Sequence, residues 1–468
     1  MEELPSRLRQ TWSRYRGHFW TRTRDQGEHT YDYMSGLLRI TGRRTYSDIA
    51  REASESSDNI QHFMSNSPWS GRGVINQVQR EVSALWEDQV DRVLILDESA
   101  DAKAGPVSAG SGRQHNGRLG KEDVCQVGVF LTLACGSIWT WIDGELFVPE
   151  AWFKPQALRR RQRAGIPETR TFQTKVELGW QMIERAQSAG IPFDWFACDD
   201  LYGRVNWFRA KLAAAEIVYM ADVPSNTRVY LKRPTWGVPA KKKRGKQPRC
   251  PRVLSPEPPV PVSAVAQDSN TVWQTLRVRT TERGELMAPY AARLVWTLRD
   301  DAPTQEWLVL RREADGEIRY AFSNAPADTP LPQLAYRESA RCFVECSIRD
   351  AKSELGWDDL QAIKYRAWEH QLALTILASW FIAETRWDWR SQFPPDDTLR
   401  SELGVDVLPT LSLANVRELL RATMPLRQLS ISEAQDLVSI HLLSRTRSRQ
   451  SRLKKQCDLL QFHSRDPA

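Results

Sequence analysis

The amino-acid sequence predicts an α/β protein with a β-rich insertion, and three features of the chain support this. Apolar runs of strand length begin near residue 91 and recur up to residue 224, with helical periodicity between the later ones. Alternating apolar residues dominate 225–335. Before residue 90 and after residue 336 the apolar positions follow helical spacing. We therefore expect an α/β core that is interrupted once and flanked by helical regions.

Composition and length are those of a soluble globular protein with more than one domain. Hydrophobic residues make up 41% and charged residues 26% of the 468 residues. The apolar run at 373–383 is too short to span a bilayer, and the N-terminus lacks the apolar core of a secretory signal. The seven cysteines form no CxxC pair and no zinc-ligand pattern. We expect a cytoplasmic protein with free thiols and no membrane partner.

The N-terminal region, 1–90, is predicted to be helical. Within 44–70, Ile49 and its apolar neighbours lie on one face and Phe63 and its neighbours on a second, with a Ser/Asp-rich break between them. Two short helices joined by a polar turn fit a helix-turn-helix, although any small helical domain can contain such a pair. We expect this region to bind DNA, chiefly through phosphate contacts and a helix at about 57–66.

The core, 91–224, is predicted to begin with a buried strand that ends on Asp97. Two or three apolar strands follow within 123–149. The later elements are a helix at 170–190, a strand at 193–200, a helix from about 204 to 215 and a strand at 215–224. The order is thus three strands, helix, strand, helix, strand.

The rest of the chain divides into three regions. Residues 225–335 form the insertion, with a Pro- and Lys-rich first part and a later hairpin whose turn is the Asp-Gly pair at 315–316. Residues 336–390 return to helix and carry the late helix of the core. Residues 391–468 form a mostly helical C-terminal region with a basic tail, in which order is expected to end near Ser444.

Three strands, then alternating helices and strands, then a later helix is the element order of an RNase H-like fold. That fold carries one acid on its first strand, a second after its fourth strand and a third on a late helix. Asp97, Asp199 and Glu345 occupy those places, and Asp200 lies beside the second. A lone Asp at the end of a strand is otherwise a common terminator. Acids at all three places favour a shared site.

Three carboxylates at one site suit the cleavage of phosphodiester bonds. The reaction needs an activated water or hydroxyl and a stabilised 3′-oxygen as leaving group, which two Mg²⁺ ions about 3.5–4 Å apart supply together. Mg²⁺ prefers oxygen ligands, and clustered carboxylates repel one another without it. We therefore expect Asp97, Asp199 and Glu345 to bind two Mg²⁺ ions, for which Mn²⁺ is the expected substitute.

Several stretches of the chain resemble one family, and the resemblance extends over residues 30–390. The stretches are LDESADAKAG at 96–105, SGRQHNGRLGKEDVCQVGV at 111–129, CDDLYGR at 198–204, and the spacing of Arg341, Glu345 and Lys352. In them the sequence is similar to the DDE insertion-sequence transposases that carry a YREK motif, and the second stretch is the most specific match. Glu338 stands where that motif has its Tyr.

The resemblance implies roles for further residues. Tyr202, three residues after Asp199, selects that acid rather than the next one as the metal ligand. Arg341 and Lys352 join the catalytic set, and their spacing puts both on one helical face with Glu345. On an arbitrary helix such a face would more often be a solvated, salt-bridged stripe.

Basic and aromatic residues outside the acid set indicate a nucleic-acid partner. Basic blocks lie at 159–163, 231–252 and 444–455 in a chain with 19 tryptophans. Such blocks are otherwise solvated surface, and 228–252 is either a mobile loop or a DNA-tracking arm, of which we favour the arm. The residues that we expect to contact DNA are Lys103, Arg113, Lys121, Tyr202, Trp236, Lys241, Lys242, Lys243 and Arg244. Lys103 and Lys121 are equally well explained as ordinary surface lysines.

Together these features predict a DDE transposase, an enzyme that cuts the ends of an insertion sequence and joins them to target DNA by metal-dependent strand cleavage and strand transfer. Its expected partners are double-stranded DNA, as terminal inverted repeats and as target, and a second copy of the chain in the synaptic complex. The resemblance implies the bacterial cytoplasm and association with the nucleoid. The alternatives are a catalytically silent, transposase-derived DNA-binding protein and an RNase H-like structure-specific nuclease.

Overall fold

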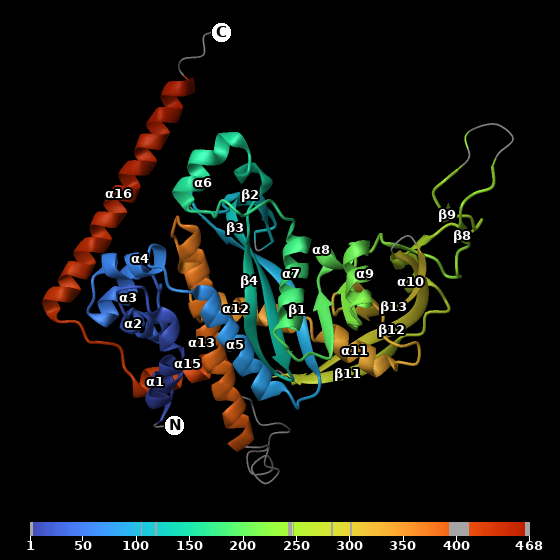
Figure 1. Cartoon of the computed structure of the whole chain (residues 1–468), viewed down its shortest axis with the longest axis horizontal. Coiled ribbons are helices and arrows are strands. Elements are labelled where there is room, and N and C mark those ends of the chain that lie inside the picture. Colours follow the sequence, from blue (N-terminus) through green and yellow to red (C-terminus); the bar gives the residue numbers. More distant parts are fainter. Residues whose placement is uncertain are drawn as a thin grey trace. The chain divides into compact units, whose positions relative to one another are not determined.

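The computed structural model of the chain consists of two compact units, Met1–Met424 and Pro425–Ala468. It describes residues 3–103, 105–117, 119–241, 246, 248–281, 284–299, 302–392 and 411–463. In the first unit a large mixed sheet carries helices on both of its faces (Figure 1).

Five strands of this sheet form the part that positions the acids. They are β1 (Arg92–Ala102), β3 (Lys121–Cys135), β4 (Ile138–Phe147), β5 (Trp195–Cys198) and β6 (Tyr219–Asp222). Their order is β4-β3-β1-β5-β6; β3 pairs antiparallel with β4 and β1, whereas β1, β5 and β6 are parallel. This is the strand order of an RNase H-like fold, as the sequence predicts. A short polar strand, β2 (Gly112–Asn116), also pairs with β3, and no apolar pattern indicates it.

The described helices of the first unit are distributed along the whole chain. They are α1 (Leu4–Tyr15), α2 (Gly27–Arg39), α3 (Tyr46–Ala53), α4 (Ser57–Ser65), α5 (Gly71–Trp86), α6 (Leu158–Ala164), α7 (Lys175–Ser188), α8 (Asp200–Gly203), α9 (Asn206–Ala214), α10 (Val262–Gln267), α11 (Leu331–Ser339), α12 (Cys342–Ser353), α13 (Tyr365–Gln392) and α15 (Leu413–Thr423), with the 3-10 turns η1 (Arg16–Phe19), η2 (Glu150–Trp152), η3 (Pro155–Ala157) and η4 (Trp357–Asp359).

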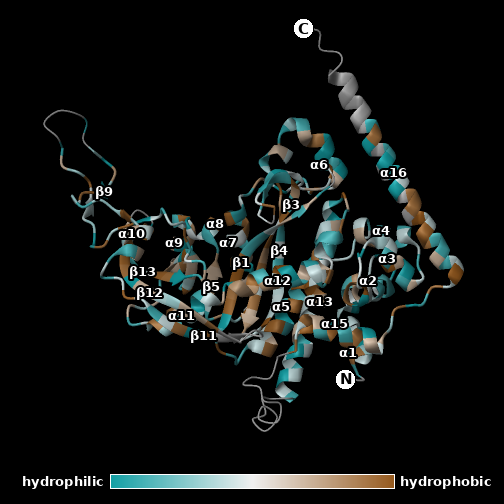
Figure 2. Ribbon diagram, turned by 180° about the vertical axis from the view of Figure 1, so that it is seen from behind, coloured by the Kyte–Doolittle hydropathy of each residue, from teal (hydrophilic) through white to brown (hydrophobic). Residues whose placement is uncertain are grey.

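The side chains of β1 alternate between the two faces of the sheet, and each face packs against different helices. Val93 and Ile95 belong to a buried cluster with residues of α11 and α12. Leu96 packs on the other face against α7, so closely that a Cβ atom added at Gly179 would lie 2.5 Å from Leu96 Cδ2. Figure 2 shows hydrophobic residues concentrated along these central strands. The strand period therefore decides which helix each side chain of β1 meets.

The β-rich insertion extends this sheet rather than forming a separate one. After β6 the sheet continues through β14, β13, β12 and β11, and it has 10 strands in all. The predicted hairpin is present, because β13 and β14 pair across a turn in which Gly316 has φ 88°, a conformation that favours glycine. The strands of the insertion are β7 (Arg228–Val229), β8 (Trp236–Gly237), β9 (Arg252–Val253), β10 (Val260–Pro261), β11 (Gln274–Thr281), β12 (Gly284–Arg299), β13 (Ala302–Arg312) and β14 (Ile318–Ser323).

Helices α3 and α4 form the predicted helix pair. Thr45 caps α3, because its side chain accepts a hydrogen bond from the backbone of Asp48 while the Asp48 side chain accepts one from the backbone of Thr45. Ser54 adopts a left-handed φ of 57° and ends α3. Ser56 then caps α4.

The N-terminal helices are fastened to the sheet through α13, which contacts α2, α4, α5 and β4. His370 of α13 is 2% exposed, and its ring stacks on Trp69 with 3.6 Å between centroids. Its ring nitrogens lie 2.9 Å from the carbonyl oxygen of Met64 and 3.1 Å from that of Trp69. Burial lowers the pKa of His370 to about 4, so the ring is neutral at physiological pH. The helix pair therefore packs directly on the core.

The second unit contains the long helix α16 (Ile431–His463). This corrects the expectation that order ends near Ser444. Arginine, lysine and glutamine are good helix formers, so a basic segment continues the helix as readily as an apolar one. Across the described residues, no helix combines the length and the apolar character needed to cross a membrane.

Candidate active site

Three carboxylates meet where the parallel pairing of β1 and β5 ends. The last paired residues are Leu96 and Cys198, and Asp97 and Asp199 follow them directly. Glu98 is the next residue of β1. One ligand oxygen from each of Asp97, Glu98 and Asp199 lies within 4.8 Å of the other two. Strand β1 itself continues to Ala102, so the prediction that it ends on Asp97 is wrong, and Asp97 marks instead the end of its pairing with β5. Because the two strands run parallel, the residues after their last paired positions lie side by side, which is why acids distant in the sequence converge here.

Local structure turns Asp199, rather than its neighbour, toward this cluster. Asp199 is the N-cap of α8, and its Oδ1 accepts a hydrogen bond from the first turn of that helix at 3.0 Å. Helix α8 lies so close to β6 that a Cβ atom at Gly203 would come within 2.0 Å of the carbonyl oxygen of Asp222, so only glycine fits. The Asp200 side chain, in contrast, is 46% exposed and pairs with Arg204 at 3.3 Å.

Two cations contact the acids of this region. Lys175 Nζ lies 2.7 Å from Glu98 Oε1. Arg341 stands between two further acids, with its Nε 2.8 Å from Asp222 Oδ2 and its Nη2 2.7 Å from Glu345 Oε1. Among the described residues, Lys175 and Arg341 are the cations that form ion pairs with this group of five carboxylates, so the site would carry excess negative charge if all five were ionised. The carboxylates are those of Asp97, Glu98, Asp199, Asp222 and Glu345.

Burial and repulsion make the acids hard to ionise. Burial, followed by the charge of Asp199, raises the pKa of Asp97 well above its usual range. Burial and the charge of Glu98 raise the pKa of Asp199 to about 7. Burial also raises the pKa of Asp222 to about 7. A cation bound among these groups would favour their charged forms, so the arrangement has the chemistry of a cation site.

Comparison with known proteins identifies the family. Residues 17–285 match the family model described as DDE superfamily endonuclease, and the match covers more than half of the chain, including Asp97 and Asp199. The chain belongs to the DDE superfamily endonucleases. The matched segment ends before the helix that carries Glu345.

One curated relative of this DDE endonuclease is the probable transposase for insertion sequence element IS701 of Microchaete diplosiphon. The two sequences are 25% identical over 337 residues, which are 70% of this chain and 75% of that protein. Among solved structures, a piggyBac transposase in a synaptic complex with hairpin DNA aligns with 93% of this chain and 82% of its own length at 11% identity. The TM-score is 0.34, a level at which no detail is transferable.

In this DDE endonuclease the third predicted acid, Glu345, lies outside the three-carboxylate cluster. Its side chain is 57% exposed on α12, and Arg341 holds its carboxylate. Helix α11 ends at Ser339 and α12 begins at Cys342, so Arg341 stands at a junction from which it contacts α12 and β6 at once. Glu345 is therefore linked to the cluster region through Arg341 rather than inserted into it.

Lys352, predicted to be catalytic, anchors α12 to β1. Its Nζ lies 2.7 Å from Asp101 Oδ1 and 2.9 Å from the carbonyl oxygen of Ala100. Trp357 Nε1 donates to the other oxygen of Asp101 at 2.8 Å. These contacts occupy the ammonium group within the fold, so Lys352 influences the site through the position of α12.

Two residues expected to contact DNA are turned into the protein. Tyr202 is 0% exposed, and burial together with the charge of Glu98 raises the pKa of its hydroxyl. Lys103 Nζ donates to the carbonyl oxygen of Leu360 at 2.6 Å, and burial lowers its pKa. We correct the expectation for Tyr202, because a phenol without exposed surface does not reach a phosphate. The expectation for Lys103 stays a prediction, because its half-buried ammonium group keeps donors beyond this one bond. Motif spacing locates a residue along the chain and leaves its side-chain direction open.

The other predicted DNA contacts lie on different parts of the first unit. Arg113 on β2 and Lys121 at the start of β3 are exposed. Trp236 is half-buried in the short β8–β9 pair, and Lys241 after it is exposed. Figure 1 shows this pair projecting beyond α10, β12 and β13. Lys242, Lys243 and Arg244 lie outside the described residues.

Sequence reasoning missed three residues of the site. Glu98 directly follows Asp97, and neighbouring residues of a strand are expected on opposite faces of the sheet. Glu98 was therefore not expected at the same site as Asp97. Asp222 is the last residue of β6, and Asp199 directly follows β5. An acid at the end of each of two successive parallel strands was the signal that could have revealed Asp222. Lys175 lies at the start of α7 and has no signal of its own.

Proposed function

We propose that this chain is an insertion-sequence transposase that cuts the ends of its element and joins them to target DNA. The observation that carries the proposal is the convergence of Asp97, Glu98 and Asp199, because an uncompensated carboxylate cluster in a DDE endonuclease suits divalent cations. The similarity to a probable insertion-sequence transposase supports the substrate class.

Asp97, Asp199 and Glu345 would hold two Mg²⁺ ions, with Mn²⁺ as substitute, and Glu98 is a further candidate ligand. The donor set fits, because it consists of carboxylate oxygens and those of Asp97, Glu98 and Asp199 already lie within 4.8 Å of one another. When bound, the ions would activate the attacking water or hydroxyl and stabilise the 3′-oxygen that leaves.

The chain's own residues orient these ligands. Lys175 holds Glu98 from α7, and Arg341 holds Glu345 while its charge reaches Asp97 and Asp199. Lys352 fixes α12 against β1. Arg341 and Lys352 are thus positioning residues in this proposal.

Removal of the ligands tests the proposal. Asp97→Ala, Asp199→Ala and Glu345→Ala should each abolish metal-dependent nicking of the element's ends and leave binding to those ends largely intact, because the ligands hold metal rather than DNA. Gel-shift and nicking assays on the same preparations measure both properties. Asp200→Ala is the matched control and should nick normally. If Asp199→Ala nicks fully and Asp200→Ala does not, Asp200 rather than Asp199 is the metal ligand.

The products distinguish the proposed function from its alternatives. A transposase joins the cut ends to a second duplex, whereas a structure-specific nuclease only hydrolyses. Absence of nicking by the wild type in both Mg²⁺ and Mn²⁺, with binding retained, would identify a catalytically silent DNA-binding protein. The DNA that flanks the gene supplies the terminal repeats for these assays.

We also propose that residues 1–90 recognise the element's ends and that two copies of the chain assemble on two ends. A third proposal is that the β8–β9 segment, with Trp236 and Lys241, is a DNA arm. The exposed surface of α4 and the projection of β8–β9 support these roles. Changing Lys241, Lys242, Lys243 and Arg244 together to Ala should make the salt dependence of binding shallower by up to about 0.9 per lost phosphate contact. An unchanged slope would make the segment a linker.

A further inference from the structure

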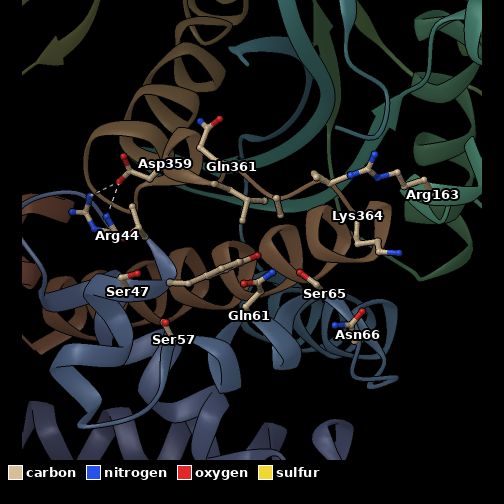
Figure 3. Close-up of a pocket in the computed structure, with 15 residues that line it drawn as sticks. Arg44, Ser47, Ser57, Gln61, Ser65, Asn66, Arg163, Asp359, Gln361 and Lys364 are labelled. Atoms are coloured by element: carbon tan, nitrogen blue, oxygen red, sulfur yellow. Dashed lines mark hydrogen bonds and ion pairs between the residues drawn. The ribbon is translucent and has the colours of Figure 1, made fainter. Parts of the chain in front are cut away.

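A polar groove lies between the helix pair and the core, and it shares no lining residue with the acid cluster (Figure 3). Its volume is about 530 Å³, within the range of ligand-binding sites. One wall is α4 with the start of α3, and the other is the segment 359–364. Arg163 of α6 also lines it. We call it the α4 groove, defined by Ser57, Gln61, Asn66, Arg163, Gln361 and Lys364.

Helix α4 turns a stripe of hydrogen-bonding side chains toward this groove. Ser57, Gln61 and Ser65 recur at every fourth residue and therefore lie on one side of the helix. Phe63, which lies between them in sequence, is 0% exposed in the core. Within the described part of the chain, the side chains of Ser57, Gln61 and Asn66 make no hydrogen bond. These three side chains are therefore available to a ligand, whereas Ser65 is buried beside Tyr46.

The charged side chains of the α4 groove that have no ion-pair partner among the described residues are positive. Arg163 and Lys364 lie at the same end of the groove in Figure 3, and neither has an ion-pair or hydrogen-bond partner among the described residues. The other charged residues of the lining are used by the fold. Arg44 is 5% exposed and donates to backbone carbonyls, and Asp359 accepts a hydrogen bond from the backbone of Arg44 at 3.0 Å. Two unpaired cations beside neutral donors favour an anionic ligand.

The α4 groove joins the helix pair to the strand that carries the acids. Its core-side wall is tied to the chain that continues β1, because Lys103 Nζ donates to Leu360 O at 2.6 Å and Ala109 N donates to Ile363 O at 2.9 Å. The opposite wall is tied to α13 through a hydrogen bond of 2.9 Å from Arg366 to the carbonyl oxygen at the end of α4. A strand bound in the groove would contact both parts at once.

We propose that the α4 groove binds the sugar-phosphate backbone of one DNA strand, between the helices that recognise the element's end and the site that cuts it. Arg163 and Lys364 neutralise phosphates, and Ser57 and Gln61 hydrogen-bond to phosphate or sugar oxygens. The polar lining suits a nucleic-acid backbone better than the apolar ligands that most pockets of this volume take. This inference rests on the proposed function.

The full-length double variant Arg163→Ala/Lys364→Ala tests the inference, with Lys154→Ala/Lys211→Ala as the matched control. The control removes two exposed cations that neither line the groove nor belong to the three basic blocks. Binding is measured by gel shift over a series of salt concentrations, on a duplex with the terminal repeat and on a scrambled duplex. We expect roughly tenfold weaker binding of the double variant. We also expect a salt slope shallower by up to about 0.9 per lost contact.

A second pair of variants guards against a folding defect. Gln61→Glu is nearly isosteric and places a negative charge in the groove, whereas Gln162→Glu places the same charge on exposed surface outside it.

Neutral methylphosphonates, introduced singly into the DNA backbone, should weaken wild-type binding at one or two positions and have no effect there on the double variant.

The outcomes separate the two levels of the proposal. If the wild type nicks ends and the groove variants bind like their controls, the α4 groove is not a DNA site, while the proposed function stands. If the wild type neither prefers element ends nor nicks DNA, the proposed function fails and the groove proposal fails with it. Weaker binding confined to the groove variants supports both.

Discussion

Asp143 on β4 and Asp97 on β1 are carboxylates of one sheet with opposite surroundings. Asp143 is 0% exposed, and its two oxygens accept hydrogen bonds from Arg72 at 2.6 Å and from Arg185 at 2.8 Å. Among the described residues no cation hydrogen-bonds to Asp97, whose Oδ1 accepts from the backbone of Glu98 at 2.7 Å. The charged groups that most affect its pKa are other acids.

This difference distinguishes a structural carboxylate from a ligand. A buried acid whose arginines come from the same fold is satisfied as an anion without any bound partner. A partly buried acid among acids, such as Asp97, is destabilised as an anion until a cation binds. Burial alone therefore does not identify a functional acid, whereas burial with uncompensated charge does.

The largest expected effect is on catalysis by Asp97→Asn. This change should abolish metal-dependent nicking, because a ligand is lost. The free energy of unfolding of the metal-free protein should stay the same or rise, because repulsion with Asp199 and Glu98 is relieved. Nicking assays and thermal unfolding in a chelator measure the two effects. A lower melting temperature would make Asp97 a structural acid and would remove the contrast with Asp143.

The next effect is on stability and is expected from Asp143→Asn. Arg72 and Arg185 would lose one of two shared partners, since Glu145 Oε1 still lies 3.6 Å and 3.0 Å from their Nη2 atoms, and we expect the free energy of unfolding to fall by about 3 kcal/mol. The value lies at the low end for a broken buried pair because the two arginine side chains are 39% and 34% exposed. Denaturant unfolding measures it. Asp200→Asn, at an exposed ion pair, is the control and should change stability by less than about 1 kcal/mol.

A smaller effect is expected from pH. Because the pKa of Asp199 is raised from 3.8 to about 7 in the fold, the unfolded chain releases this proton at lower pH than the folded chain does. The contribution of Asp199 to the stability of the metal-free protein should therefore decrease from about pH 4 to about pH 7 and stay constant above. Subtracting the pH profile of Asp199→Asn isolates this contribution.

Mg²⁺ provides the complementary measurement. Metal ligands must be deprotonated, so Mg²⁺ should raise the melting temperature of the wild type more at about pH 8 than at about pH 5. Asp199→Asn should lose most of this dependence. An Mg²⁺ effect that does not vary with pH would argue against a protonated carboxylate cluster.

The smallest effect is expected from Trp357→Phe, at the hydrogen bond to Asp101 of β1. Asp101 is 6% exposed and bonded to Lys352 as well as to Trp357, so it resembles Asp143 rather than Asp97. Loss of one hydrogen bond should lower the free energy of unfolding by about 1 kcal/mol and leave nicking nearly unchanged. Denaturant unfolding and nicking assays measure this. A large loss of nicking would mean that the anchor of α12 sets the rate.

The core of the fold was predictable because its signals are local. Apolar runs and helical periodicity predicted strands at β1, β5 and β6 and the helix α7, and their order is that of an RNase H-like fold. Asp97, within β1, and Asp199, directly after β5, converge because they follow the last paired residues of two parallel strands. The polar strand β2 has no such signal, and it was missed.

The sequence by itself determined the order of elements along the chain, the places of Asp97 and Asp199, and the hairpin around Gly316, since each depends on the period of a single segment or on its turn residues. The tertiary structure alone decided that the insertion continues the catalytic sheet, that Tyr202 and Lys103 turn inward, and that Arg341 holds Glu345. These features depend on which surfaces far apart in the chain approach one another. Periodicity records whether a side chain is buried, and only the packed fold decides which partner it meets.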